Sequence, residues 1–294
     1  MTTSLKKVLF ILNPKAGSRK AIQLKKQLID AGSNIDFRLT AFPGHSKQII
    51  LEEMEHYDVF VAVGGDGTVN EVASVLAGKE KALAVFPTGS GNGFAREFGF
   101  SNNLEQLLAA IERGKLHSAD VCYLNGHSSV HMSGLGYDAA VAHDFAHSKG
   151  RGFWNYLLST IRIYFAKHTI EANIQWEDQT IKDRFFMINL ATIAQFGYGA
   201  KIAPMANPTD GLLTMVLVKP MPLIHFLGFS ARLFLGTLKP NHYVRYISTA
   251  GPITIQTSNK QVHIDGDPVF LKSPIKIEVH RGTLKVVDTK LSKF

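Results

Sequence analysis

The sequence predicts an α/β domain followed by a mostly antiparallel β domain, and three observations lead to this fold class. The first part of the chain alternates short apolar runs with helix-like segments, which is typical of parallel strands joined by helices. Later segments are longer and rich in β-branched and aromatic residues. The chain has 294 residues, which is enough for two domains that each bury a core.

The N-terminal part contains four expected strand–helix units. The expected strands are residues 7–12, 35–40, 59–63 and 82–86. The expected helices are residues 19–31, 45–56, 69–77 and 104–113. Ligands of such sheets bind beyond the carboxyl ends of the strands, so we expect the three loops that follow strands one, three and four at one edge. These loops are residues 13–18, 64–68 and 87–93.

The pattern changes near residues 120–125, where the β domain is expected to begin. Its expected strands are residues 169–176, 180–194, 212–218, 242–257 and 275–280, with a last short strand at 282–287. Two apolar segments, residues 153–168 and 223–238, are expected to be helices with interleaved basic residues. Such helices face a core, line an acyl pocket or rest on an acidic bilayer.

The charge balance favours an anionic partner. Lys and Arg total 32 against 24 Asp and Glu, a net charge of +8, which suits a nucleotide or an acidic membrane surface. General solubility is the alternative explanation. No nucleic-acid-binding motif occurs, so no nucleic-acid partner is expected. Cys122 is the only cysteine, and no apolar stretch reaches about 20 residues, so we expect a cytoplasmic protein without a membrane span.

The sequence Gly-Gly-Asp-Gly-Thr at residues 64–68 lies between an expected strand and an expected helix. Glycines allow a sharp bend and close approach to a ligand, and a helix N-terminus offers N–H groups to a phosphate. Asp66 would repel a phosphate unless Mg²⁺ lies between them, or unless the carboxylate caps the helix. The loop therefore predicts a Mg-nucleotide site and leaves both roles of Asp66 open.

Four further segments have a structural and a functional interpretation. Residues 13–18 and 87–93 are either ordinary turns or further walls of one nucleotide site. Asp265-Gly266-Asp267 is either a β-hairpin turn or the source of a general base for phosphoryl transfer to an alcohol. Residues 207–212 are either a turn or a Mg²⁺ site, which Asp120 could support.

Taken together and in this order, these motifs resemble the diacylglycerol kinase catalytic-domain family, which includes bacterial soluble lipid kinases, sphingosine kinases and ceramide kinases. The resemblance covers nearly the whole chain, although Gly-Gly-Asp-Gly alone is shared with NAD kinases and phosphofructokinases. It implies an α/β nucleotide domain at residues 1–124 plus about 281–294, and a β-sandwich lipid domain at 125–280, with a cleft between them. It also implies an ATP-dependent lipid kinase that uses Mg²⁺ and touches membranes peripherally. The resemblance leaves undecided whether the protein forms a homodimer.

The resemblance assigns roles to individual residues. ATP would contact the following residues: Asn13, Pro14, Lys15, Ala16, Gly17, Thr40, Gly64, Gly65, Asp66, Gly67, Thr68, Val69, Asn70 and Ser90. Mg²⁺ would be held by Asp210 with the carbonyls of Asn207 and Leu212, and by Asp120 through water. Asp267 takes the place of the family's glutamate base, with Asp265 as a helper and Asp66 near the transferred phosphate.

The chain departs from the family pattern at its predicted base and in one loop. Asp267 is one methylene shorter than glutamate, which costs roughly 1 Å of reach. Ser90 and Gly93 replace the usual Thr and Asp of bacterial diacylglycerol kinases, so the sequence leaves the identity of the lipid alcohol undecided. Diacylglycerol is the expected substrate, converted to phosphatidic acid in phospholipid biosynthesis. The alternatives are a sphingoid-base or ceramide kinase, an NAD-kinase-like enzyme of soluble metabolites, and a catalytically silent lipid-binding regulator.

Overall fold

The computed structural model describes residues 7–16, 23–24, 26–29, 35–148, 153–166 and 168–292. The chain folds into two compact units. The first contains residues 1–119 and 281–294, and the second contains residues 120–280. The unit boundaries fall inside strands β5 (Leu116–Leu124) and β16 (Ile275–Val287), so both strands contribute to both units.

The first unit is built on a parallel sheet in the order β2-β1-β3-β4-β16. Its first four strands are β1 (Val8–Leu12), β2 (Ile35–Leu39), β3 (Val59–Gly64) and β4 (Ala82–Pro87). Every residue of β1, β3 and β4 is buried, as expected for parallel strands with both faces covered. The α/β prediction for this part of the chain is confirmed.

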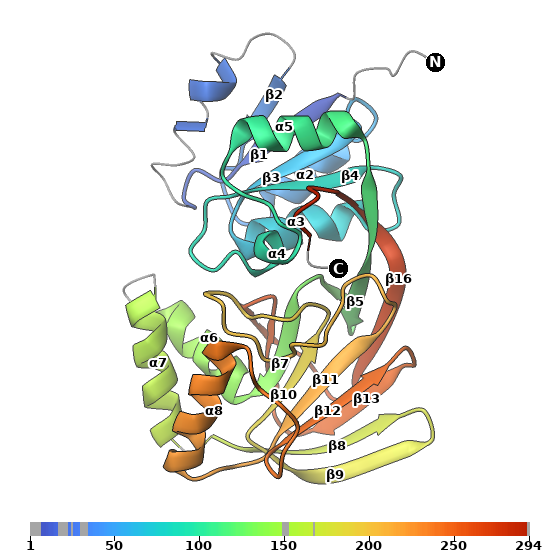
Figure 1. Ribbon diagram of the computed structural model, residues 1–294. Helices are drawn as coiled ribbons and strands as arrows, with labels where there is room; N and C mark the ends of the chain where they lie inside the picture. The colour runs from blue at the N-terminus through green and yellow to red at the C-terminus, as the bar shows by residue number, and fades with distance from the viewer. Residues whose placement is uncertain are drawn as a thin grey trace. The chain divides into compact units, whose positions relative to one another are not determined.

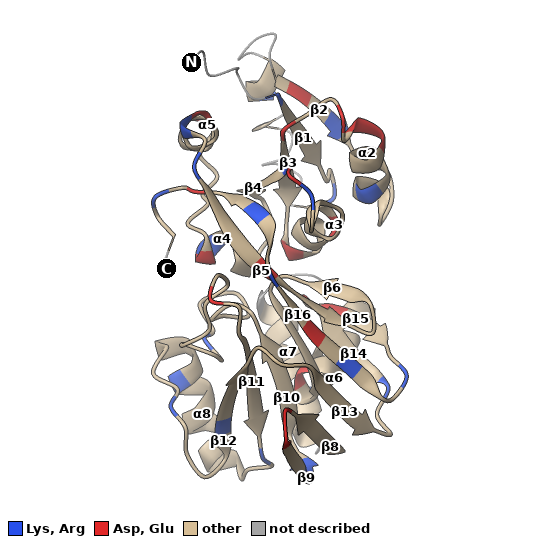
Figure 2. Ribbon diagram, turned by 90° about the vertical axis from the view of Figure 1, so that its right-hand side faces the viewer, with Lys and Arg blue, Asp and Glu red and all other residues tan. Residues whose placement is uncertain are grey.

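Helices cover both faces of this sheet, as Figures 1 and 2 show. They are α2 (His45–Glu53), α3 (Asp66–Leu76), α4 (Gly93–Glu97) and α5 (Leu104–Arg113). Helix α5 matches its predicted bounds because Asn103 caps its start and Gly114, at φ 69°, ends it. Helix α3 begins three residues earlier than predicted, directly after the glycine pair.

The second unit packs two sheets face to face. One sheet runs β12-β11-β10-β7-β14-β15 and is antiparallel throughout. The other contains β13, β8 and β9 with the N-terminal part of β16, and β5 and β6 pair beside them. A continuous apolar core drawn from both sheets, including Ile188, Met215, Ile255 and Ile277, lies between them. The predicted β-sandwich is confirmed.

The strands of this sandwich are short, and most of them form hairpins. Their bounds are β6 (His127–Ser129), β7 (Met132–Gly136), β8 (Ile170–Trp176), β9 (Gln179–Phe185), β10 (Met187–Ala191), β11 (Leu213–Val218), β12 (Val244–Thr249), β13 (Ile253–Thr257), β14 (Gln261–Ile264) and β15 (Asp267–Phe270). Three helices, α6 (Tyr137–His147), α7 (Phe153–Phe165) and α8 (Leu223–Leu235), lie against the outer face of the six-stranded sheet (Figure 1).

Four predicted strands differ from the structure. The run 180–194 is two strands, β9 and β10, because the chain crosses between sheets at Phe186, whose N–H bonds to the carbonyl of Val218. The run 242–257 is likewise divided into β12 and β13, which belong to different sheets. The runs 275–280 and 282–287 form the single strand β16, because Gly282 accommodates a φ of 63° inside it.

Candidate active site

The three predicted nucleotide loops meet at one edge of the first unit's sheet. Asn13 Nδ2, after β1, donates to Thr68 Oγ1 across 3.3 Å. Thr88 Oγ1, after β4, donates to the carbonyl of Ala16 across 2.9 Å, and the N–H of Thr88 bonds to the carbonyl of Gly64. The loops predicted separately from the sequence are therefore hydrogen-bonded to one another. Gly17 lies outside the described residues.

The remaining predicted nucleotide contacts differ in exposure. Pro14, Lys15 and Ser90 are exposed, and Asn70 is half-buried. Thr40 is buried, and its N–H bonds to the carbonyl of Leu12. Val69 is buried inside α3, so its side chain packs in the core. Thr88, which the sequence reasoning did not single out, is the hydroxyl that ties two of the loops together.

Close contacts explain why two positions in these loops are glycines. A Cβ on Gly89 would lie 2.6 Å from Gly65 Cα, well inside van der Waals contact. A Cβ on Gly64 would overlap the side chain of Thr68. Gly89 therefore admits only glycine because the two loops touch there through their main chains, and Gly64 because the Thr68 side chain occupies the space of a Cβ.

Gly89→Ala is expected to separate the loop after β3 from the loop after β4 and to weaken ATP binding by about tenfold or more, since a nucleotide site depends on fixed N–H positions. Isothermal titration with a non-hydrolysable ATP analogue measures this change. Gly228→Ala is the matched control, because a Cβ there meets no atom within 4 Å and the backbone is not in the left-handed region. Equal affinities for wild type and Gly89→Ala would contradict the assignment of these loops.

Asp66 occupies the first turn of α3 but does not cap that helix. Its Oδ1 accepts a hydrogen bond of 3.3 Å from the N–H of Phe94, in the first turn of α4. A Cβ added to Gly91 would lie 3.2 Å from Asp66 Oδ2, so the carboxylate also adjoins the loop after β4. Asp66 thus joins two loops of the candidate nucleotide site, and metal contact by this residue stays a prediction.

The Asp265-Gly266 turn joins β14 to β15 as a tight hairpin. Asp265 and Gly266 have φ values of 51° and 90°, the left-handed conformations that an Asp-Gly hairpin turn requires. The turn interpretation is therefore correct, and it does not exclude a catalytic role for the same residues. It places Asp267 at the start of β15, where the residue is exposed.

The two aspartates of this hairpin have opposite environments. Asp265 is 5% exposed, and its carboxylate accepts four hydrogen bonds. The donors are Ser129 Oγ at 2.6 Å and the N–H groups of Val130, His131 and Met132 at 3.0, 3.1 and 2.9 Å. Asp265 therefore fastens the start of β7 to the hairpin turn. Asp267 is the aspartate that remains accessible to a substrate.

The predicted Mg²⁺ residues lie on the turn at residues 207–212 and on β5, whose Asp120 is hydrogen-bonded to that turn. Asp120 is 1% exposed, its N–H bonds to the carbonyl of Pro208, and its Oδ2 accepts from the N–H of Gly211 across 2.7 Å. Asp210 Oδ1 accepts from the N–H of Leu212 across 2.9 Å. The carboxylates of Asp120 and Asp210 and the carbonyls of the turn are hard oxygen donors of the kind that Mg²⁺ prefers. Within the described residues, no three His, Cys, Asp or Glu side chains cluster as a metal site.

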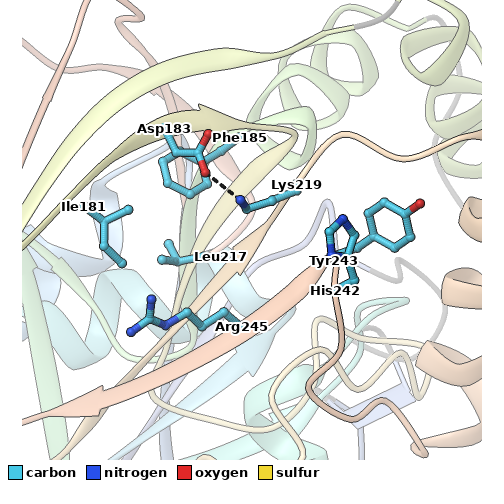
Figure 3. Close-up of a pocket in the computed structure, with 8 residues that line it drawn as sticks. All are labelled: Ile181, Asp183, Phe185, Leu217, Lys219, His242, Tyr243 and Arg245. Atoms are coloured by element: carbon cyan, nitrogen blue, oxygen red, sulfur yellow. Dashed lines mark ion pairs between the residues drawn. The ribbon is translucent and has the colours of Figure 1, made fainter.

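A small pocket in the second unit is separate from all of these residues. Figure 3 shows the residues that line it, which come from β9, from the end of β11 and from the start of β12. Strands β9 and β12 are edge strands of the two different sheets. Its lining residues are Ile181, Asp183, Phe185, Leu217, Lys219, His242, Tyr243 and Arg245. Asp183 pairs with Lys219 across 2.7 Å, and this contact holds the pKa of Asp183 below its usual value. None of the predicted site residues lines this pocket.

Comparisons with known proteins agree with the motifs. Residues 7–124 match the diacylglycerol kinase catalytic domain, and residues 131–288 match the YegS C-terminal NAD kinase beta sandwich-like domain. A "Probable lipid kinase YegS-like" protein of Pseudomonas aeruginosa is 29% identical over 229 residues, 76% of each chain. A "Diacylglycerol kinase" of Bacillus subtilis is 24% identical over 277 residues, 90% of each chain.

Solved structures share the fold. The crystal structure of a diacylglycerol kinase from Bacillus anthracis superposes with a TM-score of 0.75 at 22% identity, covering 98% of both chains. At that identity the likeness bears on the fold alone.

In the part of the chain that the structure describes, no helix has the length and apolar character of a membrane span. By its two domain matches, the chain belongs to the family that joins a diacylglycerol kinase catalytic domain to a YegS C-terminal beta sandwich-like domain.

Proposed function

We propose that this chain is an ATP-dependent lipid kinase whose main substrate is diacylglycerol. The observation that carries the proposal is the meeting of three loops, after β1, β3 and β4, around the glycine contact of Gly65 with Gly89. Membership of the diacylglycerol kinase family supports the choice of a lipid alcohol as acceptor.

In the proposed reaction, the loops of the first unit hold the triphosphate of ATP through main-chain N–H groups and the N-terminus of α3. Asp267 accepts the proton of the lipid hydroxyl, and the hydroxyl oxygen attacks the γ-phosphorus. The bond from the γ-phosphorus to the bridging oxygen breaks, and ADP leaves. Mg²⁺ bound near Asp66 would offset the charge that develops on the phosphates. We assign Asp267 alone as the base, because Asp265 already accepts four hydrogen bonds.

A substrate panel tests this proposal. Purified protein is incubated with γ-labelled ATP and mixed micelles that contain diacylglycerol, a sphingoid base or ceramide, and separately with NAD. Label in phosphatidic acid above all other products supports the proposal. Label mainly in the sphingoid base or ceramide would show that this lipid, and not diacylglycerol, is the substrate. Label only in NAD would contradict the assignment as a lipid kinase. ATP and liposome binding without any label supports a silent regulator.

We further propose that α7 and α8 rest on an anionic membrane, so that the kinase reaches its lipid substrate. Their exposed large apolar residues are Trp154, Leu158, Ile161 and Phe165 on α7, and Leu223, Ile224, Leu227, Phe234 and Leu235 on α8. The helices pack together through the stacked rings of Tyr164 and Phe226, 4.2 Å apart. Neither helix contains an acidic residue, and exposed Arg232 lies among the apolar residues of α8, whereas exposed Arg162 of α7 is paired with Asp144 across 2.9 Å. This combination suits a negatively charged lipid surface.

The double substitution Trp154→Ser with Ile224→Ser is expected to weaken vesicle binding by about tenfold or more, because each side chain loses apolar burial of about 1.5–3 kcal/mol. Flotation with phosphatidylglycerol vesicles measures binding, and phosphatidylcholine vesicles test the charge contribution. The control is Leu51→Ser, which removes a side chain that is 66% exposed on α2 of the other unit. Unchanged flotation of the double variant would contradict this membrane face.

A further inference from the structure

A buried polar row crosses the helix-covered face of the six-stranded sheet in the second unit. Gly134 of β7 is in register with Asn189 of β10 on one side and with His263 of β14 on the other. Residues paired in register point to the same face of a sheet. Asn189 is 0% exposed and His263 is 4% exposed, so both polar side chains are buried.

Asp138, in the first turn of α6, binds both side chains of this row. Its Oδ2 accepts from Asn189 Nδ2 across 3.1 Å and lies 3.1 Å from His263 Nε2. Its Oδ1 accepts from the N–H of Ala139 across 2.9 Å. A Cβ on Gly134 would overlap the Asp138 carboxylate, so the glycine makes room for it. One buried carboxylate thereby connects α6, β10 and β14.

Burying these polar groups costs folding free energy, which suggests that the network has a role beyond stability. Within the described part of the chain, Asn189 Oδ1 and His263 Nδ1 have no hydrogen-bond partner. Apolar side chains of similar size would stabilise such a core at least as well, whereas hydrogen bonds impose distance and direction. The network therefore constrains where β14 lies relative to α6 and β10.

The position of β14 matters because β14 leads directly into the predicted base. Asp267 follows His263 by four residues, across the Asp265-Gly266 turn. Strand β15 is the edge of its sheet, and its packing within the described residues is limited to Val269 against the core and the ring of Phe270 against His143. Strand β14 pairs with β7 through only three residues, Val262, His263 and Ile264. Two sets of hydrogen bonds therefore restrain this hairpin: those of Asp265 at the turn and that of His263 with Asp138 on β14.

We propose that Asp138 and His263 are positioning residues for Asp267. They hold β14 so that the hairpin presents the carboxylate of Asp267 at a fixed place. The proposal rests on the proposed kinase function, in which Asp267 takes the proton of the lipid hydroxyl. Neither Asp138 nor His263 is assigned contact with ATP or with the lipid.

The test compares kinetic constants of variants at Gly134 and His263. His263→Leu removes the donor to Asp138 and is expected to lower kcat by about 10–100-fold, since a misplacement near 1 Å costs rates of that order. The KM for ATP is expected to stay unchanged, because the nucleotide loops belong to the first unit. His263→Gln keeps a donor of similar reach and is expected to restore most of kcat. Gly134→Ala displaces Asp138 and is expected to repeat the loss.

A second readout does not depend on activity. Hydrogen exchange of the peptide covering residues 261–270 is expected to become faster in His263→Leu and to return toward wild type in His263→Gln. The control is Met215→Ala, a buried core substitution on β11 that does not pair with β14. It is expected to lower thermal stability while leaving kcat and hairpin exchange unchanged. If His263→Leu does not fold, Asp138→Asn, which keeps the side-chain shape, takes its place.

The outcomes separate this inference from the proposed function. A wild-type protein that phosphorylates no lipid overturns the kinase function, and the exchange data then decide the positioning role alone. A His263→Leu variant that resembles Met215→Ala in kcat and in hairpin exchange overturns the inference. So does a His263→Gln variant that is as impaired as His263→Leu.

Discussion

Asp267→Asn is expected to lower kcat for lipid phosphorylation by about 10²–10⁴-fold, which is the usual contribution of a general base. The amide keeps the size of the side chain but cannot take the proton of the attacking hydroxyl. Because Asp267 is exposed at the start of β15, the change is expected to leave the folded structure intact. Initial rates with γ-labelled ATP and the preferred lipid measure the effect, with circular dichroism to verify folding.

Asp267→Glu is the matched comparison, because it keeps the carboxylate and adds one methylene. The family resemblance predicts glutamate at this position, so Asp267→Glu is expected to retain activity within about tenfold of wild type. ATP affinity is expected to be the same in all three proteins, since the nucleotide loops lie in the first unit. An Asp267→Asn protein with wild-type kcat would remove Asp267 from the mechanism.

Asp265→Asn is expected to destabilise the protein by about 2–4 kcal/mol, because a buried carboxylate with four donors becomes an amide that turns an N–H₂ group toward some of them. Asparagine tolerates the left-handed conformation of this residue, at φ 51°, so the backbone does not add to the loss. Urea unfolding followed by circular dichroism measures the free energy of unfolding.

Asp178→Asn provides the control for this stability experiment. Asp178 is an exposed aspartate in the β8–β9 hairpin turn, and its substitution is expected to change stability by no more than about 0.5 kcal/mol. If Asp265 were the base itself, its asparagine variant would lose activity and keep its stability. That result would reverse the division of roles between the two aspartates.

Local patterns predicted most of the fold correctly. The buried runs of β1, β3 and β4 and the capped helix α5 follow from short-range apolar periodicity and from single residues such as Asn103 and Gly114. Local patterns did not reveal where the chain changes sheets. The residues around Phe186 continue a β-rich run without interruption, and only the pairing of β9 and β10 with different partners divides it.

The candidate site shows the same division between local and long-range information. Glycine and asparagine loops after apolar strands predicted the nucleotide edge, since such loops at the carboxyl ends of parallel strands must lie together. Only the structure decided that Asp66 does not cap its own helix, because its carboxylate accepts from the N–H of Phe94 on a different helix. The polar row of Asp138, Asn189 and His263 has no local signal, because its members are more than fifty residues apart.

The sequence by itself determined the two-part fold, the family and the three loops that are proposed to hold ATP. Only the tertiary structure separated the two aspartates of the Asp265–Asp267 turn. The turn residues favour a hairpin locally, but the donors that surround Asp265 come from residues 129–132, more than 130 positions earlier in the chain. Whether a carboxylate is buried among donors or exposed to a substrate depends on such long-range packing, which short-range residue preferences do not encode.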